Sequence, residues 1–347
     1  MASSKDADPS LDYLTHTKAS YPFEKFELGS FVGSCNGLAC LEHSRPMPVY
    51  NWNMEPGIVV WNPFTGLYRT LPDHDCCFHL RYARGFGYDS ASDDYKVFFA
   101  TCHYNGGGNR VDIFSLRDGS WKGVENPARE LQHLIRRDSM GLFLNGALHW
   151  EFENGKDGLT KIIAFDLAKE TFYDVSLPLS GHHQLSPLNY GYEYYTMGVV
   201  GEYLCICFFA TDHDQEGLRI NINVWVMKEY CNEASWVHCV SYTPNRLFDD
   251  ATYVPNSIPR SAKDVGYIIL QYSRGCIDVL ELIDNNPDEG SDETEGQYSN
   301  KIRFFYRLDS FSAIPYTEAL TSPYLPRASI DQGILEHSSQ AKPCLLK

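Results

Sequence analysis

The densest group of potential metal ligands in this sequence is the hexapeptide His74-Asp75-Cys76-Cys77-Phe78-His79. Zinc sites usually separate their paired cysteines by two to four residues. Because Cys76 and Cys77 are adjacent, their thiolates cannot easily reach one ion. We interpret the segment as a loop between structural repeats, with a zinc site as the less favoured alternative, and we expect no metal.

Sequence signatures of catalysis do not occur. The chain has no Gly-x-Ser-x-Gly nucleophile elbow, no phosphate-binding loop, no His-Glu-x-x-His motif and no dinucleotide fingerprint. The pairs Asp93-Asp94 and Asp249-Asp250 lie in predicted turns, where aspartates typically bond to the local backbone. We therefore expect no catalytic residue and no cofactor.

Aromatic side chains in predicted loops are the better candidates for binding another protein. Tyr190 and Tyr192 precede a predicted strand, and Trp52 lies in a long loop predicted over residues 42–56. Tyrosine and tryptophan offer large contact areas and a polar atom, which interface hot spots use. Arg137, one of two adjacent arginines in a loop, completes the candidate set.

The elements that would position these loops form a repeat. An apolar run that ends on a large side chain, followed by a turn and a second aromatic run, recurs along most of the chain. The large side chains are 53, 51, 60 and 55 residues apart and are Trp61, Phe114, Phe165, Trp225 and Leu280. A period of roughly 50 residues is typical of propeller repeats and close to the kelch spacing.

Each cycle contains four strand-like runs. The dipeptides Asn36-Gly37 and Asn145-Gly146 separate the first two runs of their cycles, and Asn-Gly is a strong hairpin signal. Four antiparallel strands form a blade that cannot bury both its faces alone. We therefore predict an all-β, kelch-like β-propeller of about five to six four-stranded blades. The tryptophans at repeat positions should be core, namely Trp61, Trp121, Trp150, Trp225 and Trp236.

The last part of the chain is less regular. The acidic segment 284–296 is too polar to pack and should be a disordered insertion in an outer hairpin. Residues 338–347 also have no apolar pattern, so we expect an unstructured tail. Residues 313–320 could provide a strand that helps to close the ring.

Composition limits the possible partners and compartments. A formal net charge of -16 argues against a nucleic-acid backbone or an anionic membrane as the main partner. No run approaches the ~20 apolar residues of a membrane helix, and the N-terminus lacks the apolar core of a signal peptide. Eleven cysteines, an odd number, favour reduced thiols. We expect a cytoplasmic or nuclear protein.

Three motifs resemble a known family. Residues 33–38 (GSCNGL), 60–66 (VWNPFTG) and 85–89 (GFGYD) are similar to the F-box-associated, kelch-like propeller of plant F-box proteins. The resemblance covers about residues 30–325. It implies a protein-interaction module that recognises substrates for a cullin-based ubiquitin ligase, with an unknown protein as its substrate.

In that family an F-box precedes the propeller and binds a Skp-type adaptor. Residues 1–29 contain no segment long or apolar enough for such a helical bundle, so we expect adaptor binding only if an F-box is supplied. The expected organisation is an N-terminal extension (1–29), the propeller (30–325) and a flexible tail (326–347). The alternatives are a propeller enzyme resembling a glycoside hydrolase, a binding module unconnected to ubiquitination, and a duplicate without a role.

Overall fold

The structure is a computed structural model that is described in sixteen stretches of chain. These are residues 27–46, 54–74, 81–102, 109–124, 139–153, 160–178, 194–200, 202–214, 217–242, 256–262, 265–271, 277–283, 299–305, 315–316, 319–324 and 344–345. Nearly all of the described residues that belong to regular elements are in β-strands. The prediction of an all-β chain is confirmed.

The strands form antiparallel sheets in which chain order is also spatial order. The first sheet contains β1 (Glu27–Cys35), β2 (Leu38–Pro46), β3 (Met54–Trp61) and β4 (Tyr68–Thr70). The second contains β5 (Arg81–Asp89), β6 (Asp94–Cys102), β7 (Asn109–Ser115) and β8 (Ser120–Gly123), with β9 (Ser139–Met140) added parallel to β5. The third contains β10 (Leu142–Leu144), β11 (Ala147–Glu153), β12 (Thr160–Asp166) and β13 (Thr171–Val175).

Two further sheets follow the same plan. The fourth contains β14 (Tyr194–Val200), β15 (Tyr203–Asp214), β16 (Gly217–Met227) and β17 (Trp236–Tyr242), with the short 3-10 helix η5 (Glu233–Ser235) before β17. The fifth contains β18 (Asn256–Ala262), β19 (Val265–Gln271), β20 (Ile277–Ile283) and β21 (Ser299–Phe305). A separate two-stranded ladder joins β22 (Pro315–Tyr316) to β23 (Cys344–Leu345).

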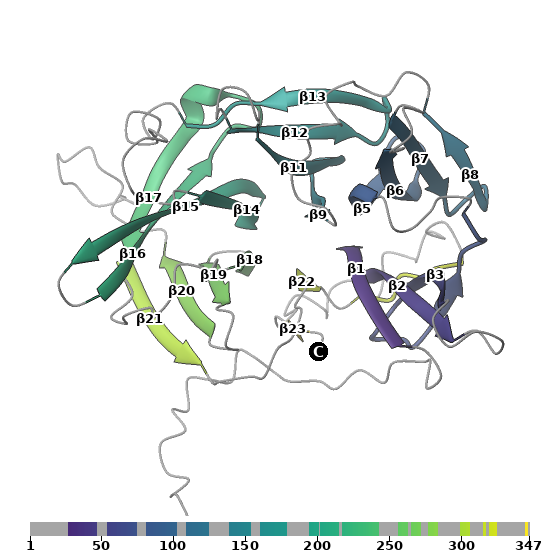
Figure 1. The fold of residues 1–347 in the computed structure, drawn as a ribbon, viewed down its shortest axis with the longest axis horizontal. Coiled ribbons are helices and arrows are strands. Elements are labelled where there is room, and N and C mark those ends of the chain that lie inside the picture. The colour runs from purple at the N-terminus through teal and green to yellow at the C-terminus, as the bar shows by residue number, and fades with distance from the viewer. Residues whose placement is uncertain are drawn as a thin grey trace, which may run out of the picture.

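The sheets are arranged around a common centre as the blades of a β-propeller (Figure 1). The strands β1, β5, β14 and β18 lie toward this centre, and β8, β13 and β21 lie on the outside. Strand β22 lies beside β1, between the last sheet and the first. The chain is therefore a kelch-like propeller, as the repeat predicts.

The hairpins predicted from Asn-Gly dipeptides are present. Asn36 and Gly37 have φ angles of 48° and 79°, and Asn145 and Gly146 have φ angles of 50° and 75°. Positive φ at both central residues is the requirement of a type I′ turn, which matches the twist of the flanking strands. These two turns join β1 to β2 and β10 to β11.

A second recurring turn joins the third strand of a sheet to the fourth. In residues 62–66, 115–119 and 166–170 the fifth backbone N–H donates to the first carbonyl, at 2.8, 2.9 and 2.8 Å. In each turn the side chain of the first residue also accepts hydrogen bonds from backbone N–H groups inside the turn. The polar residue that follows Trp61, Phe114 and Phe165 is therefore a turn cap.

Apolar side chains from neighbouring sheets fill the space between them. Consecutive residues of β6 point to opposite faces of the second sheet, as the period of a strand requires. Phe99 belongs to the core shared with the first sheet, whereas Phe98 packs 4.9 Å from the rings of Trp150 and Phe165 in the third. The blades thus share a layered core rather than each having its own.

Not every tryptophan at a repeat position is fully buried. Trp61, Trp150 and Trp236 are buried, as predicted. Trp121 and Trp225 are only half-buried. The prediction that they belong to the closed core therefore overestimates how deeply they are buried. Trp121 lies in the outermost strand β8, which has a neighbour on one edge only, and its indole N–H donates to the Pro72 carbonyl at 3.1 Å.

Two predicted irregular segments are partly strand. The loop expected over residues 42–56 is shorter, because β2 continues to Pro46 and β3 begins at Met54, where Arg45 pairs opposite Glu55. The tail expected to be unstructured contains β23, which extends the chain beside β22. The acidic segment 284–296 lies outside the described residues, between the paired strands β20 and β21.

Candidate protein-binding site

The four residues proposed from the sequence as partner contacts cannot be placed. Trp52, Arg137, Tyr190 and Tyr192 all lie outside the described residues and stay predictions. Of the hexapeptide with metal-ligand residues, only its first residue, His74, is described. Within the described part of the chain, no group of three or more His, Cys, Asp or Glu side chains could hold a metal ion.

His74 contributes to the packing between the first and second sheets. It is buried, its Nε2 lies 3.3 Å from Asp112 Oδ2, and its ring centre is 4.2 Å from that of Trp121. Burial alone would raise the pKa of Asp112, but hydrogen bonds from His74 and Arg110 hold this pKa below its usual range. The position is therefore a buried polar contact between the residues that follow β4 and strand β7.

The carboxylate pair in the turn between β5 and β6 has local partners. Asp94 accepts hydrogen bonds from the Ser115 hydroxyl and, at 2.9 Å, from the backbone N–H of Arg117. Asp93 accepts from the hydroxyl of Tyr88 and from the Arg117 guanidinium. Both groups are thus used in turn and hairpin contacts, as the sequence predicts for this pair.

A buried lysine connects the second and third sheets. The ammonium group of Lys96 lies 2.9 Å from Asp89 Oδ2 and donates to the Leu167 carbonyl at 2.7 Å. Burial would raise the pKa of Asp89, but hydrogen bonds from Ser92 and Lys96 lower it below its usual range. Since the two charges are buried together, each depends on the other for its stabilisation.

The first strands of the five sheets test the hypothesis of a glycoside hydrolase. Their sequences contain two carboxylates, Glu27 at the start of β1 and Asp89 at the end of β5. These two residues stand at opposite ends of their strand sequences, and the described first strands of the other sheets add no carboxylate. A glycoside hydrolase requires two carboxylates ~5–10 Å apart, and the sequences of the described first strands contain no recurring pair of this kind.

The side chain of Asn62, in the turn after β3, is hydrogen-bonded to residues 319–324, called here the C-terminal segment. The Asn62 amide nitrogen donates to the carbonyls of Ala319 and Thr321 at 2.7 and 2.8 Å. Its Oδ1 accepts from the backbone N–H groups of Phe64 and Thr65 at 2.9 and 3.1 Å. Asn62 is completely buried, so both ends of its amide are satisfied inside the protein.

Two more contacts hold the C-terminal segment. A Cβ atom added at Gly37 would lie 2.5 Å from the Ala319 Cβ, so only glycine permits this close approach. The Tyr324 hydroxyl donates to the Tyr68 carbonyl. The first sheet therefore contacts both the second sheet and the C-terminal segment.

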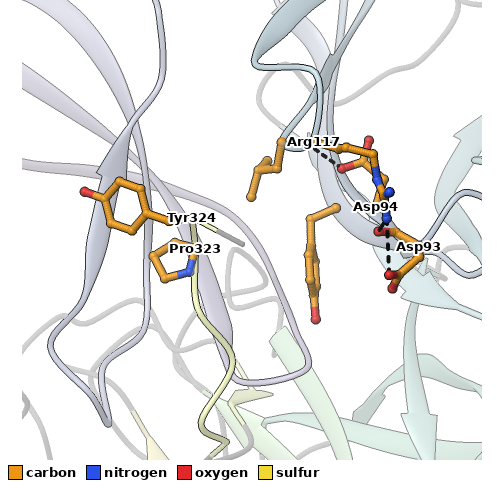
Figure 2. Close-up of a pocket in the computed structure, with 7 residues that line it drawn as sticks. Asp93, Asp94, Arg117, Pro323 and Tyr324 are labelled. Carbon is orange, nitrogen blue, oxygen red and sulfur yellow. Dashed lines mark hydrogen bonds and ion pairs between the residues drawn. The ribbon is translucent and has the colours of Figure 1, made fainter. Parts of the chain in front are cut away.

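A small pocket lies between the C-terminal segment and the second sheet (Figure 2). Pro323 and Tyr324 form one side, and Arg117 with its carboxylate partners Asp93 and Asp94 lies on the other. The pocket measures about 220 Å³ including the part open to solvent, which is less than the ~300–1,000 Å³ of typical small-molecule sites. It is a crevice within a larger surface rather than a ligand cavity.

Large apolar side chains are exposed where the first sheet meets the C-terminal segment. Eight such residues are exposed among those described, and five of them lie in the turn between β3 and β4, at the start of β4 or in the C-terminal segment. They form what we call the apolar patch: Phe64 (56% exposed), Leu67 (47%), Tyr68 (38%), Leu320 (60%) and Tyr324 (56%). With 150–250 Å² for each large side chain, the exposed area is roughly 500 Å².

The hydrogen bonds from Asn62 and Tyr324 bring the two chain segments that carry these residues side by side. An apolar surface of this total size is at the upper end of what monomeric proteins expose, and such surfaces often bind other proteins. None of the five residues was proposed from the sequence. A signal existed for Phe64 and Leu67, which lie in or next to a turn, where an apolar residue has no strand partner to cover it. Leu320 and Tyr324 follow a segment with weak periodicity, which gives no such signal.

None of the helical residues described could form a membrane-spanning helix.

Comparisons with known proteins place the chain in a family. The model of the "F-box associated beta propeller domain" matches residues 2–270. Among curated proteins, "F-box protein CPR1" of Arabidopsis thaliana is 30% identical over 258 residues, covering 65% of this chain and 55% of that protein. "F-box/kelch-repeat protein At3g23880" of Arabidopsis thaliana is 26% identical over 211 residues, covering 60% and 52%.

The chain thus spans about half the length of the curated relatives that it matches. Among solved structures, the β-propeller domain of the Trilobed protease from Pyrococcus furiosus is 10% identical, covers 84% of this chain and 86% of that one, and has a TM-score of 0.37. The family model matches well over half of the 347 residues. On that match, the chain is a member of the F-box associated β-propeller domain family.

Proposed function

We propose that this propeller recognises protein substrates for a cullin-based ubiquitin ligase and that the apolar patch is part of its binding surface. The observation that supports this most is the family match, since the similar proteins are F-box proteins. An exposed apolar surface on a rigid β scaffold is suited to binding a protein. In this proposal the propeller extends over residues 30–325, and the setting is cytoplasmic or nuclear.

The proposal assigns two separate contacts to the whole ligase subunit. The propeller binds the substrate, and an F-box binds the Skp-type adaptor. The chain itself is proposed not to be an enzyme, because the curated proteins that it is similar to are F-box proteins.

Co-purification with a Skp-type adaptor tests the division of tasks. The chain and a version fused to the F-box of a relative are each expressed with the adaptor and the cullin. We expect the fused version to bind the adaptor and to promote ubiquitination of a protein captured by the propeller. If the fused version assembles with the cullin but no captured protein is ubiquitinated, the ligase role is wrong.

A further inference from the structure

We propose that the apolar patch binds a short extended peptide with two or three large apolar side chains and a net positive charge, and that Asn62 positions the two halves of this site. The inference rests on the proposed function as a protein-recognition module and names the kind of partner that the module takes. Beyond that function, the inference specifies the class of ligand, the residues that contact the ligand and a residue, Asn62, that positions them without contacting the ligand.

The size of the patch favours a peptide over a folded surface. A stable interface between two folded proteins buries about 800 Å² on each partner. The exposed area of the five patch residues is roughly 500 Å², of which a part remains at the edge of any complex. A peptide with two or three anchoring side chains uses a surface of this size, since its small backbone needs no wide polar margin.

The side chains present are suited to anchoring such a peptide. Tyr68 and Tyr324 are both partly exposed, so part of each side chain is open to contact. The Tyr324 hydroxyl donates to the Tyr68 carbonyl, and this hydrogen bond restrains the ring of Tyr324. Aromatic residues held in this way lose little conformational entropy on binding.

The charge of the chain favours a basic peptide. The formal net charge is -16, so the long-range field attracts cations. Arg117, which lines the pocket, is 3.2 Å from Asp93, so its positive charge is paired with a carboxylate. Positive residues beside the apolar anchors would therefore accelerate association, and this effect would decrease with salt.

The patch has two halves from distant parts of the chain, and Asn62 connects them. Phe64, Leu67 and Tyr68 follow Asn62 directly, whereas Leu320 and Tyr324 come from the segment whose carbonyls accept from the Asn62 amide. Asn62 itself is completely buried and cannot touch a peptide. It is a positioning residue, because its amide determines where the second half of the patch lies relative to the first.

Selection from a displayed library of random peptides of about twelve residues tests the ligand class. The library is selected on the folded chain, and enriched peptides are synthesised and measured by fluorescence anisotropy. We expect two or three large apolar residues, net positive charge and at least about tenfold weaker binding to the double variant Phe64→Ser, Leu320→Ser. The control Val237→Ser removes an exposed apolar side chain of β17 and should leave binding unchanged.

The positioning role is tested by a double-mutant cycle. Leu320→Ser should weaken binding in the wild-type background and have little effect in the Asn62→Asp background, where the amide donors are lost. Phe64→Ser should weaken binding in both, because its position does not depend on the C-terminal segment. A general loss of stability would instead reduce the effects of both substitutions alike.

Several results would overturn the proposal. These are a failure to enrich any peptide, equal binding by the double variant, or equal coupling of Asn62 to Phe64 and Leu320. Sedimentation that shows a dimer in the wild type and a monomer in Phe64→Ser would assign the patch to a second copy of the chain. Peptide binding without ubiquitination by the F-box-fused chain would remove the ligase proposal only, whereas ubiquitination that survives the double variant would remove this one only.

Discussion

Acidification should destabilise this protein through one buried histidine, His149. Its Nδ1 lies 3.0 Å from the Leu142 carbonyl, so this nitrogen must hold the proton and donate it. Its Nε2 accepts from the hydroxyl of Tyr230 at 2.6 Å, and Tyr230 in turn accepts from Tyr173. The network joins the third sheet to the residues after β16, and every member requires a neutral imidazole ring.

The magnitude follows from the pKa of the ring in the two states. Burial lowers the pKa of His149 from 6.5 to about 4 in the folded protein. Protonation therefore favours the unfolded chain, so the stability is complete above pH 6.5 and decreases as the pH falls toward 4. For this single group the linkage relation gives a loss of about 2 kcal/mol at pH 5 and about 3 kcal/mol at pH 4.

Urea unfolding at pH 7 and pH 5, followed by tryptophan fluorescence, measures this loss. The variant His149→Gln retains a side-chain oxygen that can accept from Tyr230 and has no titrating ring. It should be less stable than the wild type at pH 7 and should lose about 2 kcal/mol less between pH 7 and pH 5. The reasoning is refuted if both proteins lose equal stability over this interval, since the two proteins differ only at position 149.

Three further predictions concern the contact between the first sheet and the C-terminal segment, and the interface between the second and third sheets. Gly146→Ala should cost about 1 kcal/mol of unfolding free energy, because φ at this position is +75°. Gly37→Ala, at φ +79° in the equivalent turn, should cost clearly more, because its Cβ would meet the C-terminal segment. Equal costs in thermal or urea unfolding would contradict that contact. Lys96→Met should cost about 3–5 kcal/mol in urea unfolding, since it leaves the Asp89 carboxylate buried beside no cation, and an unchanged midpoint would show that the pair is not buried in solution. Phe64→Ser should change the unfolding free energy by less than about 0.5 kcal/mol, because this ring is 56% exposed, and a larger loss would mean that the ring is covered.

The fold could be predicted from local patterns because each four-stranded sheet is formed by strands that are consecutive in the sequence. The Asn36-Gly37 and Asn145-Gly146 turns depend on the φ preference of two adjacent residues. Alternation in β6 sends Phe98 and Phe99 to opposite sheet interfaces, which the period of a strand determines. Neither feature requires knowledge of a distant part of the chain.

The extent to which a side chain is buried and the distant residues that it contacts could not be predicted in this way. The alternating pattern indicates which face of β8 Trp121 occupies, but not that β8 is an outer strand that leaves the ring half-exposed. The partner of His149 is 81 residues away and lies on a connection with no strand period. The apolar patch likewise joins residues more than 250 positions apart, through hydrogen bonds that the Asn62 amide donates to backbone carbonyls, which a segment of any sequence provides.

The residue types at the recurring turn show how the chain uses one position for two purposes. In the second and third sheets the capping residue is Ser115 or Asp166, whose oxygen accepts from the turn and completes the cap. In the first sheet the residue is Asn62, which also caps the turn but has two further N–H donors. A hydroxyl has one donor and a carboxylate has none, so neither could hold two carbonyls of the C-terminal segment and cap the turn together. The amide is thus required where the first sheet meets the end of the ring, and any partner bound across the apolar patch would strengthen that closure by binding both of its sides.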